Sequence, residues 1–147
     1  MINVMIVDDS AVVRSVIGEI VSRQPDMRVL GTAADPLFAL PKMRAHWPDV
    51  LVLDVEMPRM DGITFLRQLM QERPTSTIVC SSLTTAGTDA TLRAFEAGAV
   101  CVVGKPVCGL SDYLHAQDEE FVRAIRAAAA ANPTRVQLRR GAPLPDR

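Results

Sequence analysis

Five short apolar runs recur along this chain and alternate with segments of helical periodicity. The runs are not interrupted by polar residues, and valine is their commonest residue. They cover residues 4–7, 29–30, 50–53, 78–80 and 100–103. Such runs are typical of strands that are buried on both faces, as in a parallel sheet with helices packed against it. The alternation predicts an α/β fold, a doubly wound (βα)5 unit with a five-stranded parallel sheet.

Apolar residues at three- and four-residue spacing mark the helical segments, and capping residues stand at their ends. Ser10, Asp61 and Thr88 occupy positions suited to N-caps, and Gly98 stands where the fourth helix should end. The periodic residues are Val13, Val16, Ile17, Ile20 and Val21, then Ile63, Leu66, Leu69 and Met70, and finally Phe121, Val122 and Ile125. Each set predicts a helix with one apolar face.

Two prolines fall within the second helical segment. Pro36 suits a first helical turn, where the missing N–H has no partner to lose. Pro41 lies farther in and lacks the N–H that an interior residue donates. We therefore expect the helix to break or kink at Pro41.

Length, charge and cysteine usage limit the class of protein. The chain has 147 residues, 48% of them hydrophobic, which predicts one folded domain with a substantial core. Its net charge of −1 argues against nucleic-acid binding through bulk charge. No apolar run approaches the roughly 18 residues of a membrane helix, and the N-terminus lacks the pattern of a secretion signal. Cys80, Cys101 and Cys108 form no CxxC pair. We expect reduced, mostly buried thiols and a cytoplasmic location.

The composition changes after residue 131. Residues 132–147 contain three prolines, four arginines and one aspartate, and they show no apolar periodicity. This segment has the composition of a linker. The sequence predicts one domain over residues 1–131 and the start of an interdomain linker over residues 132–147.

Polar side chains follow four of the apolar runs. Asp8 and Asp9 follow the first run, Asp54 the third, Ser81 the fourth, and Lys105 comes shortly after the fifth. The carboxyl ends of parallel strands meet at one edge of the sheet, where α/β proteins bind ligands. Three converging carboxylates repel one another and favour a hard divalent cation, and magnesium prefers such oxygen ligands. A lysine and a hydroxyl beside them would complete a site for a phosphoryl group.

Each of these residues also has an ordinary structural interpretation. An Asp-Asp pair after a strand is often a helix cap, Asp54 could be a turn residue, and Ser81 and Lys105 could be solvated loop residues. The functional interpretation depends on their joint occurrence at four strand ends. That joint occurrence favours a phosphoryl site.

Three motifs, in this order, resemble the response-regulator receiver domain. They are Val-Asp-Asp-Ser at 7–10, Leu-Asp-Val-Glu-Met-Pro-Arg-Met-Asp-Gly at 53–62, and Lys-Pro at 105–106. The segments Ser-Ser-Leu-Thr at 81–84, Ala-Thr-Leu-Arg-Ala at 90–94 and Gly-Ala-Val at 98–100 resemble, more narrowly, the receiver of the chemotaxis protein-glutamate methylesterase. The resemblance covers about residues 1–131 and implies a flavodoxin-like fold with strand order 2-1-3-4-5.

The resemblance also implies a role for each strand-end residue. Asp54 would be the phosphoacceptor, and a chemotaxis-type histidine kinase would donate the phosphoryl group to it. Magnesium would be held by Asp9 directly, by Asp8 as a second acidic residue, by Asp54 and by the backbone carbonyl of Glu56. Lys105 would contact the phosphoryl group, and Ser81 would be the hydroxyl that follows it on activation. The chain itself would be a regulatory phosphoacceptor without a hydrolase site, attached in the full-length protein to a methylesterase domain.

The chain departs from the family patterns at two positions, because the chemotaxis methylesterase often has Asp-Phe where this chain has Cys101-Val102. Receivers usually carry an aromatic residue three positions before the lysine, and Val102 stands there. A short, β-branched side chain cannot make the swing of an aromatic switch residue. The sequence therefore predicts a switch that works mainly through Ser81 and the loop after it.

Two alternatives remain open. A receiver could serve a different output, such as DNA binding or a stand-alone interaction module. A phosphatase of the haloacid-dehalogenase kind also forms an aspartyl phosphate after an apolar strand. That class resembles D-x-D-x-[TV], whereas Asp54-Val55-Glu56 is followed here by Met57-Pro58.

Overall fold

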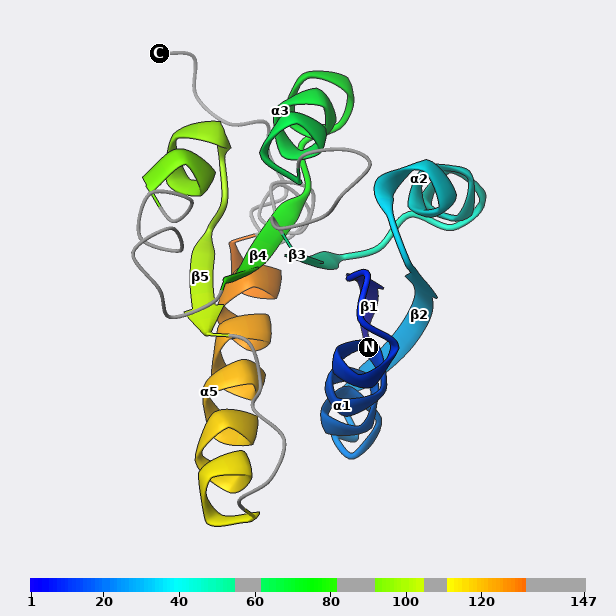
Figure 1. The fold of residues 1–147 in the computed structure, drawn as a ribbon. Coiled ribbons are helices and arrows are strands. Elements are labelled where there is room, and N and C mark those ends of the chain that lie inside the picture. The colour runs from blue at the N-terminus through cyan, green and yellow to red at the C-terminus, as the bar shows by residue number, and fades with distance from the viewer. Residues whose placement is uncertain (55–61, 82–91, 105–110, 132–147) are drawn as a thin grey trace.

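The computed structural model describes residues 1–54, 62–81, 92–104 and 111–131, of which Ser81 and residues 111–117 are described by their backbone alone. Strands and helices alternate along the chain, as the sequence predicts (Figure 1). The strands are β1 (Ile2–Val7), β2 (Met27–Ala33), β3 (Val50–Asp54), β4 (Ser76–Ser81) and β5 (Cys101–Gly104). The helices are α1 (Ala11–Ser22), α2 (Pro36–Ala45), α3 (Gly62–Glu72) and α5 (Ser111–Ala130), and residues 92–97 are also helical.

The five strands form one parallel sheet in the order β2-β1-β3-β4-β5. This order confirms the flavodoxin-like topology that the resemblance implies. Its register aligns Val7 of β1 with Leu53 of β3, and Asp54 of β3 with Cys80 of β4. The order reverses between β1 and β3, and their carboxyl ends lie side by side at that point. A ligand site is expected there in an open α/β sheet.

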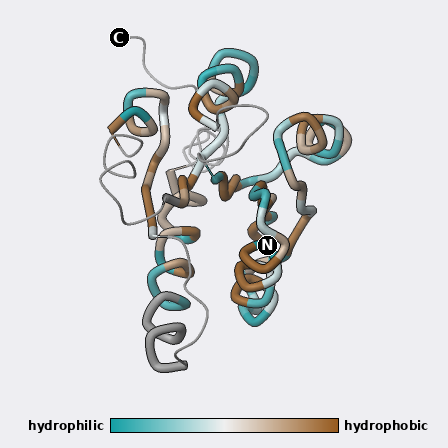
Figure 2. The backbone as a smooth tube through the Cα atoms, in the orientation of Figure 1, coloured by the Kyte–Doolittle hydropathy of each residue, from teal (hydrophilic) through white to brown (hydrophobic). Residues whose placement is uncertain are grey.

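Helices cover both faces of the sheet and enclose two apolar cores (Figure 1). On one face, α1 and α5 pack Ile17, Phe121 and Ile125 against the strands. On the other face, α2, α3 and residues 92–97 contribute Met43 and Leu66 among others. Hydrophobic and hydrophilic residues alternate along the turns of α1 (Figure 2). Burying a side chain of this size stabilises a fold by about 1.5–3 kcal/mol, so the two cores hold the strand ends in place.

Two of the predicted helix caps lie in the described residues, and both are confirmed. The Ser10 Oγ accepts a hydrogen bond from the backbone N–H of Val13 at 3.3 Å, so Ser10 caps α1. Gly98 ends the helical stretch at residues 92–97, and its N–H donates to the carbonyls of Ala94 and Phe95 at 3.1 Å each. Gly98 has a φ of +119°, which other residues rarely adopt. Asp61 and Thr88 lie outside the described residues.

Helix α2 corrects one prediction. It begins at Pro36 as expected, with Asp35 as its N-cap, but it continues through Pro41 to Ala45. The sequence predicts a break or a kink at Pro41, and the break is therefore wrong. Ala39 and Met43, on either side of Pro41, are fully buried against the sheet, and this packing outweighs the cost of one missing backbone hydrogen bond.

Every strand differs from its apolar run by one or more residues, and the largest difference is at β2. Strand β2 is seven residues long, whereas the apolar run has only Val29 and Leu30. It lies at the edge of the sheet and is mostly half-buried, so polar residues continue it. Strand β5 begins at Cys101, one residue after the predicted start at Val100.

The cysteines fit the expectation of reduced thiols where the structure describes them. Cys80 is buried and Cys101 is half-buried, and neither is part of a disulfide among the described residues; Cys108 lies outside those residues. Burial raises the pKa of the Cys101 thiol, and the nearby Glu120 carboxylate raises this pKa further. Among the described helices, none is both long and apolar enough to cross a membrane.

Candidate functional site

Three carboxylates meet where β1 and β3 end. Asp8 follows β1 directly, Asp9 comes next, and Asp54 is the last residue of β3. One carboxylate oxygen from each lies within 4.8 Å of the others. Asp8 and Asp54 are each only 1% exposed, whereas Asp9 is exposed. The structure thus brings together the three acidic residues that the strand-end pattern selects.

Local hydrogen bonds hold Asp8 on both sides. Its backbone N–H donates to the carbonyl of Ala33 at 3.1 Å, which extends the pairing of β1 with β2 by one residue. Its Oδ1 accepts a hydrogen bond from the backbone N–H of Ser10 at 2.8 Å. Ser10 in turn caps α1. The start of α1 therefore depends on the same residue that contributes a carboxylate to the cluster.

The charges of this cluster favour a cation. Carboxylates so close together repel one another, and burial makes the ionised form of Asp8 and Asp54 more costly. A divalent cation offsets both effects. The donor set is entirely oxygen and opens to solvent at Asp9, which suits Mg²⁺, an ion that keeps several of its waters. The residues present therefore fit this ion.

The remaining predicted site residues belong to the same edge of the sheet or lie outside the described residues. Ser81 is the last residue of β4 and pairs with Gly104 of β5, one step beyond the pairing of Asp54 with Cys80. Lys105 follows Gly104 directly in the sequence. Glu56 and Lys105 lie outside the described residues.

Sequence reasoning missed Arg14. This residue lies on α1, and its Nη1 donates to the backbone carbonyl of Asp8 at 2.6 Å. The only signal in the sequence is an arginine about one helical turn inside a capped helix, close to the Asp-Asp pair. Helical arginines at such positions usually point to solvent, so the pattern alone could not select it.

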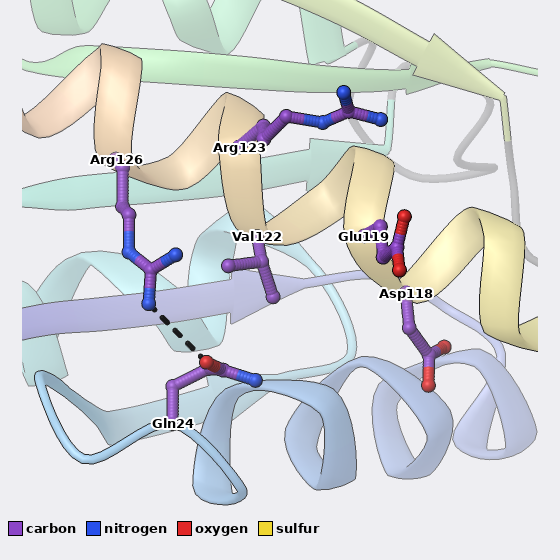
Figure 3. Close-up of a pocket in the computed structure, with 6 residues that line it drawn as sticks. All are labelled: Gln24, Asp118, Glu119, Val122, Arg123 and Arg126. Atoms are coloured by element: carbon purple, nitrogen blue, oxygen red, sulfur yellow. Dashed lines mark hydrogen bonds between the residues drawn. The ribbon is translucent and has the colours of Figure 1, made fainter.

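A groove of about 350 Å³ lies between α1 and α5, at the end of α1 that is far from the carboxylates (Figure 3). Arg126 donates to Asp26 at 3.0 Å and to Gln24 at 3.2 Å, and Arg23 pairs with Asp118 at 3.2 Å. The hydrogen bond from Arg126 lowers the pKa of the Asp26 carboxyl. These charged groups satisfy one another, so the groove does not compete with the carboxylate cluster as the candidate site.

Comparison with known proteins shows the family to which this chain belongs. Residues 4–129 match the response regulator receiver domain, and the chain belongs to this family. This membership sets aside the phosphatase of the haloacid-dehalogenase kind. The strand order is the one that the resemblance implies.

Within the receiver family, relatives to which the chain is clearly similar are chemotaxis methylesterases. The chain is 54% identical over 137 residues to the protein-glutamate methylesterase/protein-glutamine glutaminase 2 of Chromobacterium violaceum, covering 93% of this chain and 38% of that protein. It is 56% identical over 135 residues to the protein of the same name in Xanthomonas euvesicatoria, covering 92% and 38%. The chain thus spans less than half the length of these relatives.

Two solved structures agree with this assignment. The response regulator domain of Thermotoga maritima CheB is 40% identical, with a TM-score of 0.77, and the match covers 88% of this chain and 97% of that domain. A chain in the crystal structure of the P1 domain of CheA3 in complex with CheY6 from R. sphaeroides is 35% identical. Its TM-score is 0.70, and the match covers 86% of this chain and 97% of that chain. The chain is a two-component receiver of the chemotaxis type.

Proposed function

We propose that Asp54 accepts a phosphoryl group from a chemotaxis-type histidine kinase, with Mg²⁺ held beside it. The observation that carries this proposal is the approach of the Asp8, Asp9 and Asp54 carboxylates within 4.8 Å at the switch point of the sheet. In this assignment Asp9 is a direct ligand, Asp8 a second acidic residue, and the Glu56 carbonyl a further ligand. Magnesium, when bound, offsets the negative charge that gathers on the phosphoryl oxygens.

The residues of the chain would do the rest of the chemistry. A carboxylate oxygen of Asp54 forms a bond to phosphorus while the bond from phosphorus to the kinase histidine nitrogen breaks, and that nitrogen keeps the electron pair. Asp54 sits at the rigid end of a central strand, so its attacking oxygen is oriented before the donor arrives. Lys105 would bind a phosphoryl oxygen, and Ser81 would move towards another.

The relatives support a proposal about the output. The matched region covers only 38% of the Chromobacterium violaceum methylesterase, so most of that relative lies outside the match. We therefore propose that this receiver, residues 1–131, regulates a methylesterase domain through a linker that begins at residues 132–147. We place the protein in the cytoplasm, where histidine kinases present their phosphoryl groups, and we assign no nucleic-acid partner to this chain.

Beryllium fluoride tests the proposal because it mimics a phosphoryl group on a carboxylate oxygen. With Mg²⁺ present, it should shift the amide resonances of Asp9, Leu53 and Cys80 in the wild type and leave them unchanged in Asp54→Asn. Asp49→Asn is the matched control, because Asp49 lies next to the amino end of β3 and should leave the response intact. An unchanged response in Asp54→Asn would refute the assignment.

A further inference from the structure

The hydrogen bond from Arg14 reaches the peptide that joins two members of the carboxylate cluster. The Arg14 Nη1 lies 2.6 Å from the backbone carbonyl oxygen of Asp8, and this contact is half-buried. That carbonyl belongs to the planar peptide unit between Asp8 and Asp9. Because the guanidinium is charged, the bond is stronger than one between neutral groups. Arg14 therefore fixes the plane from which the Asp9 side chain departs.

The Asp8 backbone N–H and one of its carboxylate oxygens are also hydrogen-bonded, and Arg14 holds the carbonyl of the link to Asp9. The Asp8 N–H donates to Ala33 at 3.1 Å, and its Oδ1 accepts from Ser10 at 2.8 Å. Asp9 itself is exposed, so packing does not set its orientation. Rotation of the Asp8–Asp9 peptide would swing the Asp9 carboxylate relative to Asp54. The bond from Arg14 opposes that rotation.

We infer that Arg14 is a positioning residue that tunes the carboxylate cluster for a small divalent cation. The inference rests on the proposed function, because it concerns the same metal site. Magnesium requires near-ideal octahedral geometry, whereas calcium accepts six to eight oxygen ligands in flexible arrangements. A small rotation of Asp9 should therefore penalise magnesium more than calcium. Arg14 sets this preference without contacting the ion.

The positive charge of Arg14 alone predicts the opposite change in cation affinity when the residue is removed, so the inference can be tested. A guanidinium close to the cluster repels any divalent cation, so its removal alone would tighten the binding of both ions. Loss of positioning would instead weaken magnesium binding selectively. The two effects can be separated by measuring affinities for both ions.

The experiment titrates MgCl2 and, separately, CaCl2 into wild type, Arg14→Met, Arg14→Lys and Arg23→Met, reading the amide resonances of Asp9 and Ser10. Arg23→Met is the matched control, because Arg23 follows the far end of α1 and its loss changes the net charge equally. The carbonyl ¹³C resonance of Asp8 reports the hydrogen bond itself. Thermal unfolding of each variant confirms that it is folded, and Arg14→Lys, which keeps the charge, provides a second variant if Arg14→Met does not fold.

We expect Arg14→Met to shift the Asp8 carbonyl resonance and to weaken magnesium binding about fivefold, with calcium binding changed less than about twofold. Arg14→Lys should also weaken magnesium binding, because its side chain is one bond shorter and lacks the planar fork. The inference would be overturned if Arg14→Met weakened magnesium and calcium binding equally, or tightened the binding of either ion. It would also be overturned if Arg23→Met weakened magnesium binding as much, or if Arg14→Met left the Asp8 carbonyl resonance unmoved. If the wild type binds neither ion, it is the proposed function that fails.

Discussion

Asp8 and Asp9 are adjacent in the sequence but differ in burial and in hydrogen bonding. Asp8 is 1% exposed and accepts a hydrogen bond from the Ser10 N–H, whereas Asp9 is exposed. Asp8 is therefore partly a structural residue at the start of α1. Asp9 has the freer carboxylate for a direct bond to an ion.

This difference predicts that the two alanine variants lose magnesium affinity to different extents. Asp9→Ala should weaken magnesium binding about tenfold and more than Asp8→Ala, because it removes a direct ligand rather than one held through water. The affinity is measured by titrating MgCl2 against backbone amide shifts. Asp26→Ala, at the far end of α1, should bind as the wild type does. A larger loss in Asp8→Ala would reverse the assignment of the two residues.

The repulsion within the cluster predicts an effect on stability. In the presence of a chelator, Asp54→Asn should raise the free energy of unfolding by about 1–2 kcal/mol, because one of three clustered charges is removed. Urea unfolding with and without MgCl2 measures this, and the gain should shrink when magnesium is added. Asp118→Asn serves as the control on the surface. A loss of stability in Asp54→Asn without metal would contradict the repulsion described among the three carboxylates.

At the scale of the element, Gly98 ends the helical stretch at residues 92–97 and leads the chain into β5. Its φ is +119°, and a Cβ built there would lie 2.9 Å from the Met70 Cγ of α3. Both backbone strain and a steric contact therefore oppose a side chain at this position. The turn fixes the approach to the strand that precedes Lys105.

Gly98→Ala should accordingly reduce the free energy of unfolding by about 1–3 kcal/mol. Chemical denaturation measures the loss. Gly18→Ala is a suitable comparison, because a Cβ at that helical position meets no atom within 4 Å, and it should be neutral or stabilising. Similar stabilities of the two variants would mean that the Gly98 turn is not constrained as described.

Strand β5 departs from the usual receiver pattern. Val102 is half-buried and packs against the core on the α2 and α3 side, so the aromatic side chain expected in receivers has no counterpart on β5. Ser81 ends β4, and residues 82–91, which follow it, lie outside the described residues. We expect the response to start from Ser81.

Ser81→Ala should then uncouple the response while leaving the modification of Asp54 largely intact. One charge-assisted hydrogen bond contributes roughly 1.5–3 kcal/mol, which can bias a nearly balanced two-state element. Amide shifts on adding beryllium fluoride and MgCl2 should centre on residues 81–90 in the wild type and diminish there in Ser81→Ala. Shifts that centre on Val102 and persist in Ser81→Ala would contradict this mechanism.

The elements show how far sequence reasoning extends. The buried central strands were predictable because continuous apolar runs have few other uses, and Asp8, Asp9 and Asp54 could be selected because they end such runs. Strand β2 was underestimated because an edge strand tolerates polar residues, and α2 passes through Pro41 because tertiary packing outweighs a local preference. The contact from Arg14 to Asp8 depends on the path of a long side chain, which no spacing rule specifies.

At the scale of the whole molecule, the receiver family covers most of the chain, residues 4–129. Residues 1–147 contain no G-x-S-x-G motif and only two histidines, His46 and His115. His46 is exposed at the C-terminal end of α2.

This chain should therefore show no hydrolysis of glutamate methyl esters on a chemoreceptor substrate. Release of methanol measures the activity, and a full-length methylesterase supplies the positive control. Phosphorylation of Asp54 should not change the result, because it adds no nucleophile. Robust hydrolysis that depends on a serine within residues 1–147 would overturn the modular interpretation.

Intact-mass spectrometry after incubation with acetyl phosphate detects the phosphorylation of Asp54 itself, because it counts phosphoryl groups on the protein. We expect one added phosphoryl group on the wild type with MgCl2 and none when a chelator removes the metal. Asp54→Asn should remain unmodified under both conditions, whereas Asp49→Asn should be modified as the wild type is. Undiminished, magnesium-dependent modification of Asp54→Asn would show that Asp54 is not the phosphoacceptor.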